Sequence, residues 1–309
     1  MRRVLLGTLP CIAGAVYFFG WRALATVAFC CAVGLATEYV FCRTRREPVT
    51  ESVFVTAVIF ALIMPPGVGW HVLAVGMVFA VMFAKEVFGG FGRNFFNPAM
   101  AGRCFVYICF PVALTATWSP SASREGLGAL TQWTTAAPDA ITSATPLALV
   151  KTGAEPPPVA DLFFGGISGT MGVTSALLII IGGLYLYFTR TASRSIILSV
   201  VITYIVLNQS LHWLGVRPVP DALTALLGGG FLFGAFFMVT DPISAPRTPQ
   251  ARVIYGMIIA LCTVVIRNWS VFNGGLMFSI LLGNMFAPII DYSVTAWKQR
   301  KAPPEEAGA

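Results

Sequence analysis

Residues 8–41 read TLPCIAGAVYFFGWRALATVAFCCAVGLATEYVF, an apolar stretch in which Arg22 and Glu38 are the only charged residues. A helix that crosses a bilayer needs about 20 predominantly apolar residues, so this stretch is long enough for two crossings. Similar runs continue along the chain, and ten can be counted, at 4–20, 23–41, 52–66, 70–87, 98–117, 172–188, 195–213, 222–239, 251–266 and 274–292. The pattern predicts an all-α polytopic membrane protein with about ten transmembrane helices.

The composition of the 309-residue chain supports this interpretation, because 57% of its residues are hydrophobic and only 11% are charged. Soluble domains carry about 25% charged residues. The apolar runs are continuous rather than alternating, which excludes an outer-membrane barrel. Ten spans leave no room for a separate soluble catalytic domain.

Two other features exclude further classes of protein. The net charge of +7 would suit nucleic acid in a soluble protein, but here the loop Lys and Arg residues orient the spans. The seven cysteines form no CxxC pair and have no histidine at ligand spacing. We therefore expect no nucleic-acid partner and no metal or iron–sulfur site built by this chain alone.

The distribution of positive charge predicts the orientation of the chain. Of the 20 Lys and Arg residues, fifteen, Arg103 among them, fall on one side if the short connections alternate across the membrane. Positive charge collects on the cytoplasmic side of membrane proteins. Both termini are therefore predicted to be cytoplasmic, and the long connection 119–165 is predicted to lie outside.

Two pairs of segments echo each other. Residues 54–65 and 231–242 share one spacing of apolar residues before proline, and RNFFN at 93–97 is echoed by RNWSVFN at 267–273. Repeats with an odd number of spans are inserted in opposite directions; the alternative is chance similarity between apolar strings. The predicted organisation is a first five-helix half (1–118), an outer loop with a cofactor-attachment site (119–170), a second, inverted five-helix half (171–298) and a cytoplasmic tail (299–309).

Three segments carry candidate functional residues. The outer loop contains DAITSATPL (residues 139–147), a hydroxyl-rich turn that suits either a phosphate ester or a helix cap. The connection KEVFGGFGRNFFNP (85–98) is rich in glycine, which lets a backbone lie close to a bound ligand. The alternative is a plain turn between two helices. Asp241 and Asp291 lie at the ends of spans, where an acid faces an ion path or pairs with a nearby cation at the interface.

Taken together, these segments resemble one family, which includes the D subunit of the Rnf electron-transport complex and the B subunit of the Na⁺-translocating NADH:quinone reductase. The resemblance extends over nearly the whole chain and rests on the segments TLPCIAGAVYFFGWRAL, KEVFGGFGRNFFNPAMAGR, DAITSATPLALVKTG, GGLYLYF, FFMVTDPISAPRTP and GNMFAPIIDY. The segments YFFGWRAL and ATPLAL are more similar to those of the Rnf protein. The segments KEVFGG and GRN are more similar to those of the quinone-reductase protein.

The resemblance implies a covalent cofactor. Members of the family carry FMN linked through its phosphate to a threonine, and the matching acceptor here is Thr145, with Asp139, Thr142 and Ser143 in the attachment motif. A flavin transferase outside the cytoplasm would install the FMN. A second, non-covalent flavin, similar to riboflavin, is associated with the family, and the candidate residues near it are Gly89, Gly90, Arg93, Asn94 and Asn97. No catalytic residue is implied.

The resemblance also implies a function: membership of a redox-driven ion translocase in the bacterial inner membrane. Such a protein would relay electrons between partner subunits of a ferredoxin/NAD-type Rnf complex, coupled to Na⁺ or H⁺ transport. The corresponding subunit of the quinone reductase is the alternative, and a cofactor-free small-solute channel or transporter is the alternative from another class. The chain has no nucleotide-binding or iron–sulfur motif, so it is not catalytically complete alone. Val173 and Asn273 stand where relatives carry acids, which would alter ion coupling.

Overall fold

The computed structural model describes residues 1–115, 118, 128–130, 133, 146–270, 272 and 274–301. These residues form helices, and the single β-bridge among them pairs Gly20 with Trp133. Asp139, Thr142, Ser143 and Thr145 lie outside the described residues. The fold can therefore be described around the predicted attachment motif but not within it.

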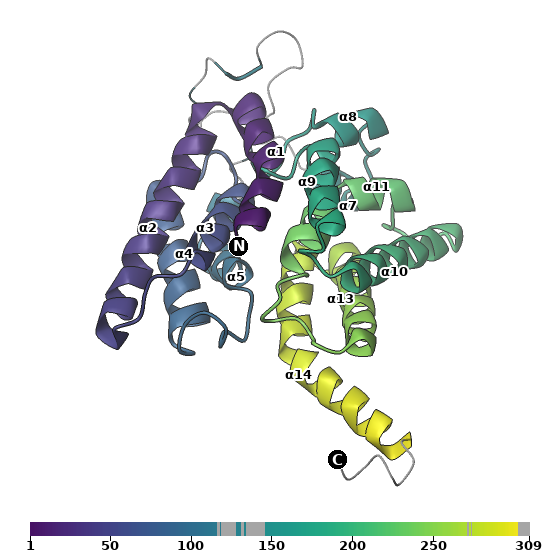
Figure 1. Cartoon of the computed structure of the whole chain (residues 1–309). Helices are drawn as coiled ribbons and strands as arrows, with labels where there is room; N and C mark the ends of the chain where they lie inside the picture. Colours follow the sequence, from purple (N-terminus) through teal and green to yellow (C-terminus); the bar gives the residue numbers. More distant parts are fainter. Residues whose placement is uncertain are drawn as a thin grey trace.

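The helices fall into two groups along the chain (Figure 1). The first comprises α1 (Arg2–Phe19), α2 (Trp21–Arg45), α3 (Ser52–Leu62), α4 (Trp70–Val81), the π-helix η1 (Met82–Glu86), α5 (Pro98–Cys109) and α6 (Pro111–Thr115). The short helices α7 (Pro146–Lys151) and α8 (Val159–Phe164) connect it to the second. The second comprises α9 (Ala176–Phe188), α10 (Arg194–Trp213), α11 (Ala222–Leu227), α12 (Phe231–Phe233), the π-helix η2 (Gly234–Met238), α13 (Pro249–Trp269) and α14 (Gly275–Lys301).

Five of the described helices are long and apolar enough to cross a membrane, namely α1, α2, α10, α13 and α14. The α3 helix has 11 residues, which corresponds to about 16 Å at 1.5 Å per residue and is shorter than a hydrocarbon core of about 30 Å. The chain is thus a multi-pass α-helical membrane protein, as predicted. The number of ten crossings and the position of the termini stay predictions.

Three of the apolar runs do not form single continuous helices, and one of them, at 98–117, is divided at Phe110 into α5 and α6. The run at 222–239 is divided into α11, α12 and η2, and Gly229 and Gly230 between them have φ angles of 60° and 70°. Such angles favour glycine, so the GGG sequence at 228–230 is the local cause of the break. The run at 52–66 is helical only up to Leu62.

The buried end of α3 is satisfied by other parts of the chain. Its terminal carbonyls accept hydrogen bonds from the backbone of the segment before α9: Gly172 donates to Leu62 at 2.8 Å, and Met171 donates to Met64 at 3.1 Å. Arg103 of α5 donates to the carbonyl of Ile63. These bonds are required because a helix end inside a membrane has no water to satisfy its unpaired carbonyls.

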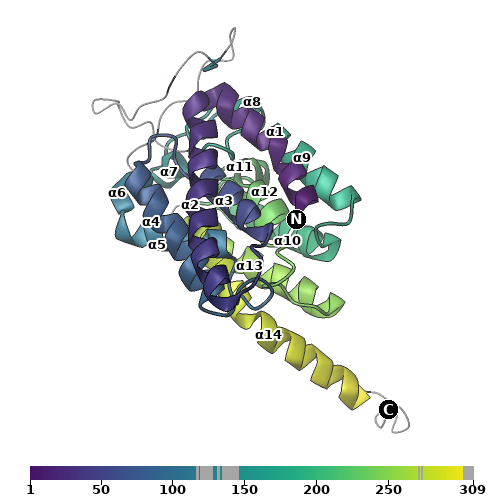
Figure 2. The same ribbon diagram turned by 60° about the vertical axis from the view of Figure 1, so that its left-hand side comes forward.

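Helices of the two groups meet in matching pairs. The α1 helix packs along α9, and α5 contacts α14; both views show α1 beside α9 (Figures 1 and 2). At the first contact Gly182 lies directly against the carbonyl oxygen of Gly7. Close backbone approach of this kind is typical of helix packing in membranes, where small residues lie at the interface.

This contact gives the first prediction. In Gly182→Ala the added Cβ overlaps the carbonyl of Gly7, so we expect a loss of stability of about 1–3 kcal/mol, the usual cost of overpacking, despite the better helix propensity of alanine. Thermal unfolding in detergent measures it. Gly274→Ala is the control, because an added Cβ there meets nothing within 4 Å. Equal midpoints for both variants would contradict the close approach.

Candidate functional site

Two cavities lie between the helix groups, and α5 and η2 contribute residues to both. We call the first the Asp241 cavity; it has a volume of about 150 Å³ and is lined by Lys85, Asn94, Asn97, Thr240 and Asp241, among others. We call the second the arginine cavity; it has a volume of about 320 Å³, and its charged lining residues are Arg103 and Arg267. The two differ in charge as well as in size.

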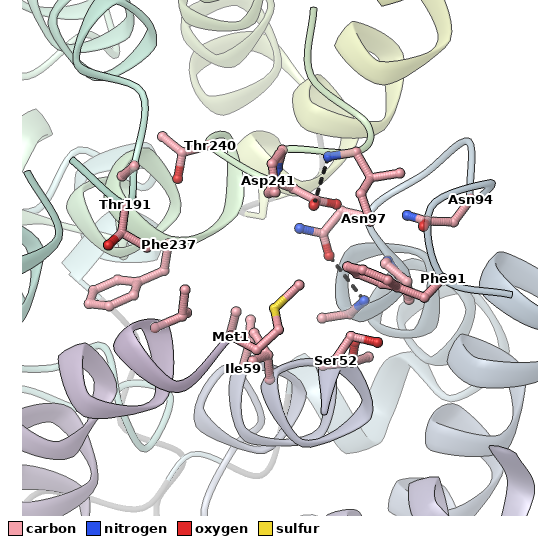
Figure 3. Close-up of a pocket in the computed structure, with 18 of the residues that line it drawn as sticks. Met1, Ser52, Ile59, Phe91, Asn94, Asn97, Thr191, Phe237, Thr240 and Asp241 are labelled. Carbon is pink, nitrogen blue, oxygen red and sulfur yellow. Dashed lines mark hydrogen bonds between the residues drawn. The ribbon is translucent and has the colours of Figure 1, made fainter. Parts of the chain in front are cut away.

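Figure 3 shows the Asp241 cavity, with Met1, Ser52 and Ile59 from the first group of helices and Thr191, Phe237, Thr240 and Asp241 from the second. Asn97 ties the two groups together. Its Oδ1 accepts hydrogen bonds from the backbone amides of Ala99 at 3.1 Å and Met100 at 3.4 Å, which caps α5. Its Nδ2 donates to the carbonyl of Met238, at the end of η2, at 3.2 Å.

Asp241 lies just after η2 and has few partners. Its Oδ1 accepts from the amide of Ile243 at 3.3 Å, and its Oδ2 accepts from the hydroxyl of Ser244 at 2.9 Å. No Lys or Arg in the described part of the chain forms an ion pair with it. Removal of water by the surrounding protein raises the pKa of the Asp241 carboxyl, and these two hydrogen bonds oppose the shift.

Asp291, the other predicted ion-path residue, lies in a different setting. Its carboxylate accepts hydrogen bonds from the amides of Arg247 at 2.7 Å and Thr248 at 2.9 Å, and from the hydroxyl of Thr248 at 2.8 Å. Thr248 is the N-cap of α13, so Asp291 holds the start of α13 against α14. It is not among the residues that line either cavity.

The glycine-rich connection 87–97 divides into two parts. Gly89 and Gly90 have φ angles of 103° and 90°, and a Cβ at Gly90 would lie 3.1 Å from the guanidinium of Arg45. These glycines and Arg93 form a tight turn and do not line the Asp241 cavity, whereas Asn94 and Asn97 do. Of the five predicted residues, the two amides are the ones that the structure brings to a cavity.

A buried charge cluster beside this cavity was not predicted. The ammonium of Lys85, on η1, donates to Glu38 at 2.6 Å, Thr50 at 2.9 Å and Ser52 at 2.8 Å. Lys85 and Glu38 are 2% and 0% exposed. Next to them Arg45 forms an ion pair with Glu86. The signal in the sequence is Glu38, the one acid within the apolar run at 23–41. An ionisable residue in a span pairs with another or faces a cavity, so Glu38 indicates a buried partner or a cavity.

The arginine cavity is lined by residues from both helix groups and from the outer connection. Arg103 comes from α5 and Arg267 from α13, whereas Leu147 and Ala148 come from α7. Arg103, counted above among the cytoplasmic cations, therefore lies within a helix and faces the same cavity as Arg267. Leu147 follows the predicted acceptor Thr145 by two residues. The chain therefore lines the cavity directly after the attachment motif. Val173 also lines this cavity, and Asn273 lies outside the described residues.

The charge cluster gives the second prediction. Lys85→Met leaves the carboxylate of Glu38 buried without its cation, so we expect a loss of stability of about 3–5 kcal/mol. The double variant Glu38→Gln/Lys85→Met removes both charges and should recover most of this loss. Thermal unfolding in detergent compares them. If the double variant is no more stable than Lys85→Met, the ion pair does not determine stability here.

Comparison with known proteins gives the family. The model of the NQR2, RnfD, RnfE family matches residues 1–299. The chain is 37% identical to the D subunit of the Na⁺-translocating ferredoxin:NAD⁺ oxidoreductase complex of Acetobacterium woodii, over 94% of this chain and 87% of the relative. It is also 37% identical to the B subunit of the Na⁺-translocating NADH-quinone reductase of Neisseria meningitidis, over 94% of this chain and 70% of the relative.

These findings confirm the resemblance inferred from the sequence motifs. With the apolar helices, they also confirm a multi-pass protein of the bacterial inner membrane and the predicted enzyme class, a subunit of a redox-driven ion-translocating complex. The chain belongs to the NQR2, RnfD, RnfE family.

Proposed function

We propose that this chain carries FMN as a phosphate ester on Thr145 and relays electrons between the partner subunits of a ferredoxin/NAD-type Rnf complex. The observation that supports this most directly is the arginine cavity, which Leu147 and Ala148 line immediately after Thr145. The names of the relatives describe Na⁺-translocating oxidoreductase complexes. We extend that activity to this chain, with Na⁺ or H⁺ as the transported ion.

The arginine cavity suits a flavin in size and in chemistry. Its volume of about 320 Å³ falls within the range of roughly 300–1,000 Å³ for small-molecule sites. Tyr107, Phe233 and Met277 supply apolar surface, and Thr170 and Thr174 supply hydroxyl groups. When bound, FMN supplies one- or two-electron transfer, and the protein contributes position and electrostatics.

The residues of α7 would hold the attachment segment in place. The ammonium of Lys151 donates to the carbonyls of Ser270 at 2.9 Å and Phe272 at 3.3 Å, just after α13. Leu147 is buried. These contacts fix the first described helix after Thr145 against the wall of the cavity that contains Arg267, so the position of the linked group would be restricted.

We place the ion path in the Asp241 cavity, between two inverted five-helix halves. The packing of α1 on α9 and of α5 on α14 suits a pseudo-two-fold axis between the halves. Asn97 at the start of α5 and Gly274 at the start of α14 line different cavities, as inversion requires. Asp241 carries the carboxylate of this path, which has no cationic partner among the described residues; Asp291, which holds α13, is the weaker candidate.

The second, non-covalent flavin of the family would need either a site elsewhere or a larger cavity beside Asp241. The Asp241 cavity, at about 150 Å³, is smaller than typical ligand sites of roughly 300–1,000 Å³. A riboflavin-like flavin near Gly89–Asn97 therefore requires the loop 87–97 to move or another member of the complex to complete the site. A flavin transferase outside the cytoplasm would be required for the linkage on Thr145.

The covalent flavin is tested by intact mass. The chain, purified after expression with a flavin transferase, should be heavier than its sequence mass by roughly 440 Da, which is FMN less one water. Thr145→Ala should abolish the gain, because it removes the hydroxyl that bears the phosphate ester. Thr152→Ala is the control, since it removes an exposed hydroxyl that lies outside the attachment motif and should leave the gain in place.

A mass without the gain, despite an active transferase, would contradict the proposal. A colourless chain that conducts a small solute into liposomes would then favour the channel or transporter.

The role of Asp241 is tested by coupled transport. In complex containing Asp241→Asn, we expect ion uptake per electron transferred to fall roughly tenfold, within the range of 5–150-fold typical of coupling between sites. Asp221→Asn is the control, because Asp221 accepts from the amides of Leu223 and Thr224 and caps α11 without lining either cavity. Unchanged uptake in Asp241→Asn would remove Asp241 from the path.

A further inference from the structure

Arg103 and Arg267 bring two positive charges to one cavity from distant parts of the chain. Arg103 lies on α5 and Arg267 on α13, and both side chains line the arginine cavity. No Asp or Glu is among the described residues that line it. In the described part of the chain, neither arginine forms an ion pair with a carboxylate.

This arrangement is electrostatically incomplete. A guanidinium does not lose its proton in a protein, and a buried charge is costly unless it is paired. Two buried or half-buried guanidinium groups that face one cavity also repel each other. A negative charge between them would remove both penalties, so the cavity favours an anionic ligand.

The protein orients both groups without neutralising them. The Nη1 of Arg267 donates to the hydroxyl of Tyr204 at 3.1 Å and to the carbonyl of Gly228 at 3.4 Å, and its Nη2 donates to the carbonyl of Gly229 at 2.6 Å. Arg103 donates to the carbonyl of Ile63. These partners are neutral, so they fix the guanidinium groups in position, and within the described part of the chain they leave the two positive charges uncompensated.

Arg267 also keeps an unused donor. Its side chain is 2% exposed, and its buried Nε has no hydrogen-bond partner among the residues that the structure describes. Buried donors are nearly always paired, and an unpaired one is costly. An acceptor atom of a bound ligand is the partner that this N–H lacks.

We propose that Arg103 and Arg267 form an anion-binding pair, and that the anion is the phosphate ester of the flavin carried by Thr145. The identity of the anion rests on the proposed function; the anion site itself rests on the two arginines. The guanidinium group matches phosphate in shape and charge. Leu147 and Ala148 line the same cavity, so the acceptor threonine lies close in sequence to residues beside the pair.

The pair is tested with free flavins in the purified complex that carries Thr145→Ala. FMN and riboflavin are the two probes, because they differ by the phosphate alone. We expect FMN to bind at this site roughly tenfold more tightly than riboflavin, as for hydrogen bonds to a charged group. Inorganic phosphate should compete with FMN and not with riboflavin. Flavin sites elsewhere in the complex are the same in all variants, so their contribution to binding cancels when the variants are compared.

Variants of the pair locate the effect. Arg267→Gln and Arg103→Gln should each reduce the preference for FMN to about twofold or less, and Arg267→Lys, which keeps the charge, should retain part of it. Arg22→Gln is the matched control, since Arg22 is also buried and donates to a carbonyl, that of Val68 at 2.7 Å, without lining the cavity. Loss of the preference in Arg22→Gln as well would overturn the assignment.

The outcomes separate this proposal from the covalent linkage. If intact mass shows no flavin on Thr145 but the complex prefers FMN through Arg103 and Arg267, the linkage is wrong and the anion pair stands. If flavin is present on Thr145 and the Thr145→Ala complex binds FMN and riboflavin equally, the anion pair is wrong. Equal binding with no flavin on Thr145 overturns both.

Discussion

The absence of water from the bilayer core is the constraint on which this structure depends. Every backbone N–H and C=O group at that depth needs a partner within the protein, and this chain breaks apolar runs after Leu62 and between Leu227 and Phe231. The break after Leu62 is satisfied by the amides of Met171 and Gly172 and by Arg103. The break at Gly228 and Gly229 is satisfied by Arg267. The same two cations therefore hydrogen-bond to the carbonyls at both breaks and line the arginine cavity.

The two cavities share helices but differ in the charged residues that line them: Arg103 and Arg267 in one, and Asp241 and the Glu38-paired Lys85 in the other. The arginine cavity contains two cations that are held by carbonyl groups, whereas the Asp241 cavity contains a carboxylate with no cationic partner among the described residues. Between them lie α5 and the segment from Phe233 to Met238, in which the rings of Phe233 and Phe237 stack at 4.8 Å. This separation means that the cavities respond to different charges while the same elements form their walls.

The sequence was sufficient for the class of fold because long apolar runs have few alternatives in a membrane. It also singled out Asp241, Asn94 and Asn97, which line one cavity, since polar residues at the ends of spans are unusual; their roles in ion and flavin binding stay predictions. It did not predict the Lys85–Glu38 pair, because the two residues are far apart in sequence and only the packing of α2 against η1 brings them together. Likewise, Arg103 was counted as a loop cation, because charge counting does not show which arginines face inward.

Under the proposed function, the placement of these charges links electron transfer to ion binding. A flavin bound there would supply one- or two-electron transfer, and each electron that it takes up would add a negative charge to the arginine cavity. Charges buried in protein are screened far less than charges in water, so the same electron raises the affinity for a cation at Asp241. Coupling through charge alone needs no large movement of the helices, which suits the close backbone contact between Gly7 of α1 and Gly182 of α9.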